Sequence, residues 1–334
     1  MVPQPRNWMS RLDKRIERLQ TEDPTCRISI VRSGGVGDTV LLLPTIQLLR
    51  QALPQAHLTL VGSSWARQLL PLMPQGLGFI QFDSTELTPL FFPDAGEDPA
   101  GVFAEADLVI IYTSREDGPL VRNARMLCDG TVRVWPVDPP AETHAACHFA
   151  AALLMDCPGL RDIPAPVLSV PSHCNSRNDV QGPTVAVHPG SGGRRKVWPS
   201  ERFAELIRSL RQEDIRVFLP EGPADKASCS EVLEKLPDHR SLVSPEKLTL
   251  VDCAGRLACC DAYVGNDSGL THVAAALGGP TLAIFGPTSP ATWRPPGGHV
   301  EVIQSRTDGR WEWPEVASVL HGVCRLLGRS DRRL

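Results

Sequence analysis

The feature that most constrains the fold is a short β-branched run that ends in a glycine-rich turn and is followed by a helical pattern. Residues 27–32 form such a run, the turn lies at 33–38, and apolar residues then recur at helical spacing as far as Pro54. The pattern restarts with a strand at 184–188. Strands that alternate with helices form parallel sheets with right-handed crossovers, so the chain is predicted to be α/β. Further strands are predicted at 57–61, 79–82, 108–112, 132–135, 215–219, 262–264 and 281–285, and further helices at 64–70, 200–212, 225–235, 270–277 and 314–327.

The 334 residues are enough for two domains that each bury a core. Between residues 161 and 183, prolines stand among Ser, Asn and Asp with no apolar period, which is typical of a linker. The predicted division is an N-terminal amphipathic segment (1–25), a Rossmann-like domain (26–165), a linker (166–183), a second Rossmann-like domain (184–313), and a C-terminal helix and tail (314–334).

Composition excludes several classes of protein. Hydrophobic residues make up 42% and charged residues 22%, which argues against a disordered chain, and a net charge of -4 offers nucleic acid no broad positive field. None of the ten cysteines forms a C-x-x-C pair, so we expect free thiols in a reducing cytoplasm. Charged residues interrupt the N-terminus and no apolar stretch is long enough to span a bilayer, which predicts a cytoplasmic protein that at most rests on a membrane face.

The first candidate site is the turn 33–38 (Ser-Gly-Gly-Val-Gly-Asp) after the first strand. Its glycines, among them Gly35 and Gly37, let the backbone approach a ligand, and Asp38 stands at the helix mouth. Asp38 has two interpretations that can hold together: an N-cap for a helix at 39–52, and a general base for an acceptor hydroxyl. The turn lacks the G-x-G-x-x-G pattern, and no acidic residue follows the second strand. A nicotinamide-dependent dehydrogenase is therefore disfavoured.

Two more candidate sites follow strands of the second half. The loop 188–199 combines glycines with Lys196 and suits a diphosphate, although a solvated basic loop is the alternative. The turn 265–272 places Asp267, Ser268 and Gly269 at a helix mouth, where free N–H groups favour phosphate oxygens. His272 lies one turn further on and is either a ligand of the same anion or a core histidine.

Two weaker patterns concern a metal and a membrane. His144, Cys147 and His148 have the spacing of one helix face and could present three metal ligands, but no carboxylate stands near them. Residues 6–20 carry an apolar stripe opposite a basic face, which could dock on an anionic membrane or pack on its own domain. The stripe consists of Trp8, Met9, Leu12, Ile16 and Leu19.

Four segments in order resemble glycosyltransferase family 9, the ADP-heptose–lipopolysaccharide heptosyltransferases and their relatives. Residues 28–44 resemble its opening strand with the Gly-Asp turn and Leu-Pro, and residues 185–203 its Pro-Gly…Lys-x-Trp-Pro…Phe segment. Residues 220–226 resemble its Gly-Pro-Ala-Asp turn, and residues 262–287 its Gly-Asn-Asp-Thr-Gly…His…Phe-Gly-Pro segment. The resemblance covers about 27 to 294, nearly the whole chain.

The resemblance implies a GT-B fold: two facing Rossmann-like domains with an interdomain cleft, the acceptor in the first domain and the nucleotide sugar in the second. It implies an inverting, metal-independent glycosyltransferase without a cofactor. The enzyme would move a sugar, expected to be heptose, from an ADP-sugar donor to a hydroxyl of a lipopolysaccharide-type or other surface glycan or glycolipid. Asp38 would be the general base, with Gly35 and Gly37 in the acceptor-side loop. The residues that would hold the donor are Gly190, Ser191, Lys196, Asp225, Asp267, Ser268, Gly269 and His272, with Asp225 near the ribose.

The sequence also departs from the family. Ser268 replaces the usual Thr and keeps its hydroxyl, whereas Leu41 stands where lipopolysaccharide core heptosyltransferases often have a His. Heptose specificity therefore rests on family membership alone. The alternative function is a nucleotide-sugar-binding protein of the same fold without transfer activity.

Overall fold

The computed structural model describes residues 8–74, 76–171, 182–236, 248–307 and 310–329. The chain divides into two compact units, Met1–Pro166 and Val167–Leu334, which are described separately below. Each unit contains one five-stranded parallel sheet. The predicted α/β class with two parallel sheets is therefore confirmed. The finer division into five segments stays a prediction, and its linker falls largely outside the described residues.

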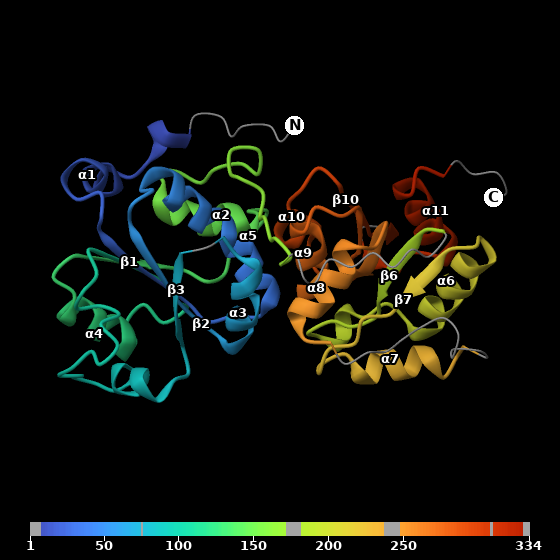
Figure 1. Cartoon of the computed structure of the whole chain (residues 1–334), viewed down its shortest axis with the longest axis horizontal. Coiled ribbons are helices and arrows are strands. Elements are labelled where there is room, and N and C mark those ends of the chain that lie inside the picture. Colours follow the sequence, from blue (N-terminus) through green and yellow to red (C-terminus); the bar gives the residue numbers. More distant parts are fainter. Residues whose placement is uncertain (1–7, 75, 172–181, 237–247, 308–309, 330–334) are drawn as a thin grey trace. The chain divides into compact units, whose positions relative to one another are not determined.

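The sheet of unit 1 has the strand order β3-β2-β1-β4-β5, with every neighbouring pair parallel (Figure 1). This is the Rossmann order 3-2-1-4-5-6 without its sixth strand, and the order reverses direction between β1 and β4. The helices α2, α3 and α5 and the segment α4 with η3 connect and cover these strands. The elements are η1 (Trp8–Arg11), α1 (Lys14–Glu22), β1 (Arg27–Arg32), α2 (Val36–Ala52), β2 (His57–Gly62), α3 (Ser64–Leu69), η2 (Leu70–Leu72), β3 (Leu77–Gln81), η3 (Thr85–Phe91), β4 (Leu108–Tyr112), α4 (Pro119–Leu127), β5 (Thr131–Trp135), α5 (Ala145–Ala150) and η4 (Ala151–Leu153).

The core of unit 1 explains why its central strands are so apolar. All five residues of β4 are buried, as expected for a parallel strand that has helices on both faces. On one face, Val31, Val109 and Ile111 pack against apolar residues of η3 and α4. On the other face lies α2, in which Val40 to Leu43 are all buried. The turn between β1 and α2 is thereby fixed by packing on both sides.

The sheet of unit 2 has the order β10-β9-β8-β6-β7 and is also parallel throughout. Counted from its own first strand this is the order 2-1-3-4-5, which reverses direction between β6 and β8. The elements are β6 (Thr184–His188), η6 (Arg194–Lys196), α6 (Ser200–Gln212), β7 (Arg216–Phe218), α7 (Lys226–Leu233), α8 (Leu250–Ala258), β8 (Ala262–Asn266), α9 (Gly269–Ala276), β9 (Thr281–Ile284), α10 (Pro290–Trp293), β10 (Val300–Ile303), β11 (Ser305–Thr307), β12 (Arg310–Glu312) and α11 (Val316–Leu326).

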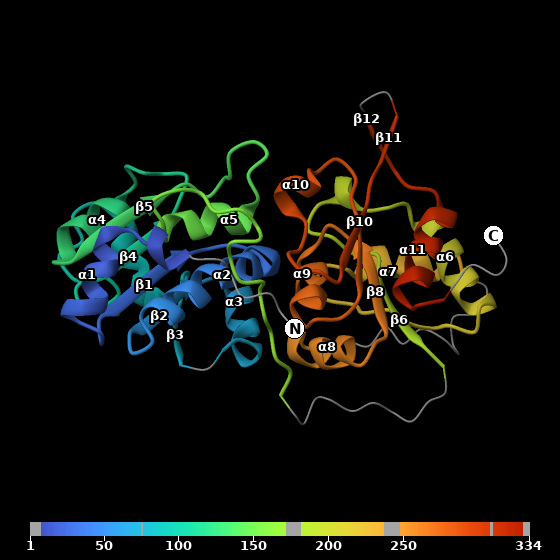
Figure 2. The same cartoon turned by 90° about the horizontal axis from the view of Figure 1, so that it is seen from above.

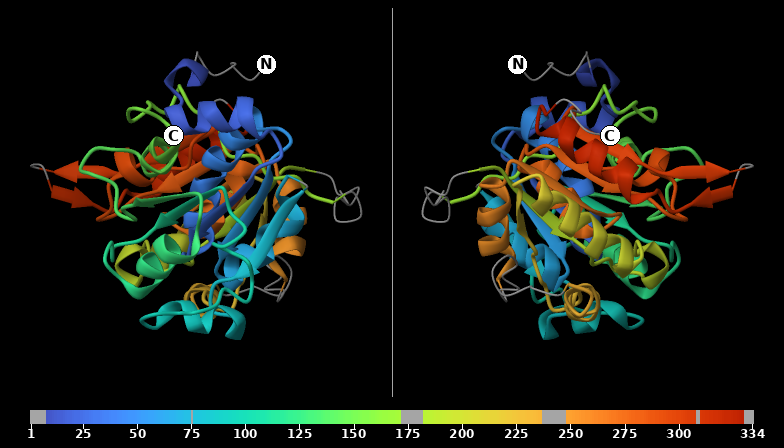
Figure 3. Two further views of the ribbon diagram at one scale, coloured as in Figure 1. Left: turned by 90° about the vertical axis from the view of Figure 1, so that its left-hand side faces the viewer. Right: turned by 90° about the vertical axis from the view of Figure 1, so that its right-hand side faces the viewer.

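The core of unit 2 lies between its sheet and the helices α6, α7 and α11. Val185, Val187 and Val264 point from the sheet into this cluster, which also holds Phe203 of α6 and Val319 of α11. Figure 3 (right) shows α11 in red beside α6 in yellow-green. The opposite face carries α8 and α9 (Figure 1). The α11 helix, predicted as 314–327, therefore closes the second Rossmann-like unit.

Some elements were missed or misplaced by the sequence patterns. The helices α4 and α8 and the edge strand β10 were not predicted, nor was the antiparallel hairpin β11–β12 that extends from unit 2 (Figure 2). The strand predicted at 262–264 continues to Asn266, and the helix predicted at 225–235 is shorter, from Lys226 to Leu233. Among the described residues, no helix combines the length and the apolar character that a membrane span requires.

Candidate functional site

The three predicted glycine-containing segments lie where the strand order of each sheet reverses. In open α/β sheets, ligands bind outside the carboxyl ends of the strands at this position. In unit 1 the turn 33–38 follows β1, the strand at which the order reverses. In unit 2 the loop after β6 and the turn after β8 follow the two strands that flank the reversal. Topology therefore singles out the same segments as the sequence patterns.

In unit 1, Asp38 is not the N-cap of its helix, so that interpretation was wrong. The chain becomes helical at Val36, and Gly35 is the N-cap with an extended backbone, which makes Asp38 the third helical residue. Its Oδ2 accepts a hydrogen bond of 2.9 Å from the backbone N–H of Gly35. A carboxylate at this position satisfies a free N–H of the first turn and gains from the helix dipole. Gly37 lies within that turn.

Asp38 also has an ionic partner that the sequence patterns did not assign. Nη2 of Arg32, the last residue of β1, lies 2.7 Å from Oδ1 of Asp38. The Arg32 side chain is only 7% exposed and its guanidinium lies 4.6 Å from the ring centre of Phe149. The Asp38 side chain remains 32% exposed. The carboxylate is therefore oriented by two donors and still accessible.

In unit 2, the loop after β6 and the turn after β8 are joined through Asp267. Oδ2 of Asp267 lies 3.0 Å from Nζ of Lys196 and accepts a 2.8 Å hydrogen bond from Oγ1 of Thr288. The hydroxyl of Ser191 donates to the backbone carbonyl of Asp267 at 2.8 Å. Asp267 is buried, whereas Lys196 is partly exposed. The acidic residue thus holds the cation in place with part of the ammonium open to solvent.

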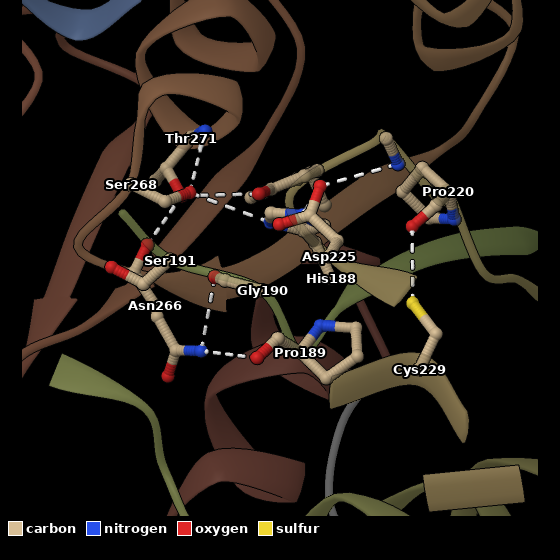
Figure 4. Close-up of polar contacts among 12 residues, drawn as sticks. His188, Pro189, Gly190, Ser191, Pro220, Asp225, Cys229, Asn266, Ser268 and Thr271 are labelled. Carbon is tan, nitrogen blue, oxygen red and sulfur yellow. Dashed lines mark hydrogen bonds and ion pairs between the residues drawn. The ribbon is translucent and has the colours of Figure 1, made fainter. Parts of the chain in front are cut away.

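The loop between β6 and Lys196 is fastened by one buried amide and one buried indole. Nδ2 of Asn266 donates to the carbonyls of Pro189 and Gly190 at 2.9 and 3.2 Å, and its Oδ1 accepts from the backbone N–H of Trp198 at 2.9 Å (Figure 4). The Trp198 ring is fully buried and Nε1 donates to the carbonyl of Pro314. Both ends of the loop are therefore fixed to the core.

The mouth of α9 has the cap that the sequence predicted. Ser268 is the N-cap, and its Oγ accepts from the backbone N–H of Thr271 at 3.4 Å. Gly269 is the first helical residue and places no side chain of its own at the mouth of the helix. His272 lies one turn along the helix and is 4% exposed, which places it in the interior of unit 2.

Asp225 is held by a histidine of the neighbouring loop. Its Oδ2 lies 3.2 Å from Nε2 of His188 and accepts from the N–H of Gly222 at 3.2 Å (Figure 4). A Cβ on Gly190 would lie 1.9 Å from Oδ1 of Asp225, so only glycine fits there. Burial raises the pKa of Asp225, but the hydrogen bond and charge of His188, together with the Gly222 N–H, leave it below its ordinary value.

The metal hypothesis for residues 144–148 is wrong. His144 is the N-cap of α5 and lies outside the helix, and Nε2 of His148 bonds to the carbonyl of Pro136 at 2.8 Å. Burial raises the pKa of Cys147 to about 12. Throughout the described ranges, His, Cys, Asp and Glu side chains form no group of three or more that could hold a metal ion.

The N-terminal apolar stripe packs on its own unit, which was one of the two alternatives. Trp8, Leu12 and Ile16 are buried, and the N–H of Asp13 donates to the carbonyl of Leu153 at 3.0 Å. Met9 of the stripe is exposed. Residues 1–7 lie outside the described part of the chain.

Comparison with known proteins decides the family. Residues 136–316, more than half of the chain, match glycosyltransferase family 9 (heptosyltransferase). The chain belongs to this family. A glycosyltransferase family 9 protein is an enzyme that transfers a glycosyl group, so the predicted enzyme class is confirmed.

Curated relatives and solved structures extend the match over most of the chain. Lipopolysaccharide heptosyltransferase 2 of Salmonella typhimurium is 25% identical over 82% of this chain and 86% of its own, and that of Escherichia coli is 26% identical with the same coverage. The structure of the E. coli ADP-heptose lps heptosyltransferase II covers 90% of this chain and 98% of its own, with a TM-score of 0.73 and 23% identity. A Veillonella parvula family 9 structure also has a TM-score of 0.73, at 19% identity and with 91% and 98% covered. The predicted GT-B fold class is confirmed.

The structure therefore groups the predicted donor residues within unit 2 and places Asp38 in unit 1. It adds four residues that the sequence reasoning did not assign: Arg32, His188, Asn266 and Thr288. Arg32, His188 and Asn266 lay within the segments that resemble the family, and Thr288 lies one residue beyond the last of them. The signal for Arg32 was a charged residue at the end of an apolar strand.

Proposed function

We propose that the protein transfers heptose from ADP-heptose to a hydroxyl of a lipopolysaccharide-type or other surface glycan, with inversion at the anomeric carbon and without a metal. The observation that carries the proposal is a set of contacts in unit 2, at the position where the strand order reverses between β6 and β8. There, Lys196, the hydroxyl of Ser191 and the capped mouth of α9 are joined through Asp267. A cation beside the N-terminus of a helix suits a diphosphate.

The names of the relatives support the donor and the acceptor. The matched proteins are lipopolysaccharide heptosyltransferases, and a related E. coli heptosyltransferase was solved with ADP and with ADP-2-deoxy-2-fluoro heptose, at TM-scores of 0.63 and 0.59 to this chain. Ser268 keeps the hydroxyl of the family's Thr. We therefore propose ADP-heptose as donor and a glycan or glycolipid hydroxyl as acceptor.

The chemistry follows from charge. In the proposed step the acceptor oxygen forms a bond to the anomeric carbon, the bond from that carbon to the diphosphate breaks, and its electron pair leaves with the diphosphate. Lys196 and the N–H groups of α9 stabilise the negative charge that grows on the leaving group. Asp38 takes the proton of the incoming hydroxyl. Because Arg32 stabilises the Asp38 carboxylate, we infer that this proton moves late in the step.

The proposal places the enzyme in the cytoplasm at the inner face of the membrane, where a lipid-linked acceptor is presented. The side chains of Lys14, Arg15 and Arg18 on α1 are exposed and offer cations to anionic headgroups. Trp8, Leu12 and Ile16 are buried and do not insert. Such contact would be electrostatic, and it would weaken as salt is added.

Transfer to a heptose-deficient lipopolysaccharide core, with ADP-heptose as donor, tests the proposal. Asp38→Asn should lower the transfer rate at least about 100-fold and leave ADP affinity unchanged. Lys196→Ala should weaken ADP binding about 10- to 100-fold, because it removes a charged hydrogen bond.

Two exposed charges serve as matched controls. The first control is Asp129→Asn. Asp129 precedes β5, at the amino ends of the strands, whereas Asp38 follows the carboxyl end of β1. The second is Arg208→Ala, on the exposed side of α6. Both should retain near-normal rates. ADP binding without transfer to any acceptor would favour the alternative, a nucleotide-sugar-binding protein, and near-normal turnover in Asp38→Asn would remove Asp38 from the reaction.

A further inference from the structure

Beside the proposed diphosphate site, three side chains form a chain: Asp225, which is partly exposed, and His188 and Ser268, which are buried (Figure 4). His188 is the last residue of β6 and is 2% exposed. Its Nε2 lies 3.2 Å from Oδ2 of Asp225, and its Nδ1 lies 3.4 Å from Oγ of Ser268. The imidazole therefore connects a carboxylate with the N-cap of α9.

Hydrogen-bond counting restricts the proton of Ser268. Thr271 donates its own hydroxyl proton to the carbonyl of Asn266, so its oxygen can only accept, and both the Tyr263 hydroxyl and the Ser268 hydroxyl lie 3.0 Å from it. A serine hydroxyl has one proton to donate. The Ser268 proton can therefore point to Thr271, to Nδ1 of His188, or to a phosphate oxygen at the helix mouth.

The protonation state of His188 decides among these directions. When the ring is neutral, the Asp225 carboxylate favours the tautomer with hydrogen on Nε2, and Nδ1 then accepts the Ser268 proton. When the ring is protonated, Nδ1–H donates to Ser268 Oγ instead. The Ser268 hydroxyl is then free to donate to a phosphate, and the cation strengthens it as a donor.

We propose that His188 is a positioning residue that directs the Ser268 hydroxyl toward the donor diphosphate when it is protonated, and withdraws it when neutral. The proposal rests on the proposed function, because it assigns a role beside the same diphosphate. Asp225 acts in it by stabilising the imidazolium. It also gives Asp225 a role as the partner of His188, whereas the family resemblance implied a position near the ribose of the nucleotide.

Among the titratable groups near the His188 imidazole, Asp225 is the ionised partner of the ring. Burial raises the pKa of Tyr263, whose ring centre lies 6.4 Å from that of His188, so the phenol is neutral. Burial likewise raises the pKa of Cys229 on α7 and Cys253 on α8, near Asp225, to about 12. Beyond Ser268, Asp267 is paired with Lys196.

The test measures ADP affinity by isothermal titration calorimetry between pH 6.0 and 8.5 in the wild type, His188→Gln and Ser268→Ala. Because the terminal phosphate of ADP itself titrates near neutral pH, the informative quantity is the ratio of each variant to the wild type. From pH 6.0 to 8.5 the wild type should lose about five- to tenfold in affinity relative to His188→Gln, the value of one hydrogen bond. Ser268→Ala should follow His188→Gln.

The outcomes separate the inference from the proposed function. Parallel pH profiles in wild type and His188→Gln would overturn the positioning role while ADP binding itself stands. No ADP binding by the wild type at any pH would overturn the proposed function and this inference with it. Thermal melts at each pH check the fold. If His188→Gln does not fold, Ser268→Ala carries the comparison, since it removes the hydroxyl and keeps the His188–Asp225 pair.

Discussion

Nη2 of Arg32 lies 2.7 Å from Oδ1 of Asp38, and this contact joins the end of β1 to the first turn of α2. The two charges differ in environment: the arginine is buried on the ring of Phe149, whereas about one third of the carboxylate side chain meets solvent. Losing either partner therefore has unequal consequences, because an unpaired charge is costly only where water cannot reach it.

Asp38→Asn should destabilise the protein more than Arg32→Met does. The first substitution leaves a buried guanidinium without its counter-ion, which we expect to cost about 2–3 kcal/mol. The second leaves a carboxylate that water and the Gly35 N–H still solvate, and Met retains the packing on Phe149, for about 1 kcal/mol. Urea denaturation followed by circular dichroism measures both. An equal or reversed order would contradict the assignment of the buried partner.

Gly190→Ala should impair donor binding, whereas Gly192→Ala should not. A Cβ at position 190 would lie 1.9 Å from Oδ1 of Asp225 and 2.7 Å from Nε2 of His188, so the loop must move. At position 192, in the same loop, no described atom lies within 4 Å of the added Cβ. We expect ADP affinity to fall at least tenfold in Gly190→Ala and to change less than about twofold in Gly192→Ala. Equal affinities in the two variants would show that the loop adapts freely.

Asn266→Ala should reduce both stability and ADP affinity. It leaves the N–H of Trp198 and the carbonyls of Pro189 and Gly190 without their partner, at about 1–3 kcal/mol for a buried group. Asn123→Ala is the matched control in unit 1. Asn123 is also buried, accepts from the N–H of Ala95 and donates to two carbonyls.

The control should lose comparable stability and retain ADP affinity. A binding loss of the same size in both variants would mean that the effect of Asn266 is one of general destabilisation. Denaturation curves and calorimetry on the same preparations distinguish the two results.

The rate at which each cysteine reacts with an alkylating reagent should follow its burial. Burial raises the pKa of Cys147, Cys229 and Cys253 to about 12, so at pH 8 only about one thiol in ten thousand is ionised. Cys157 is exposed, although its pKa is also raised. A short iodoacetamide pulse followed by peptide mass spectrometry should label Cys157 and spare the other three until the protein is denatured. Rapid labelling of native Cys229 would refute this ranking.

The two sheets were predictable because their information is local. A β-branched run, a glycine turn and a helical period occupy about 25 consecutive residues, and residues 27–52 contain all three. Elements with weak local patterns were missed for the same reason. The edge strand β10 has four half-buried residues, and the β11–β12 hairpin is polar and aromatic without clear alternation.

The polar contacts of the site were less predictable because they join distant parts of the chain. His188 meets Ser268 across 80 residues, and no local pattern indicates that pairing. The N-cap interpretation of Asp38, one of the two that the sequence allowed, was wrong for a different reason. The first helical residue depends on where the backbone leaves the extended conformation, and the extended backbone at Gly35 moved that point to Val36.

The hydrogen bond from Trp198 to the carbonyl of Pro314 spans 116 residues. During synthesis, the loop that carries Lys196 therefore emerges from the ribosome long before the segment that anchors it. The first Rossmann-like unit can fold while translation continues, but Trp198, two residues after Lys196, has no carbonyl to donate to until Pro314 has been made. A nascent chain released before Pro314 would therefore carry the Lys196 loop without this anchor.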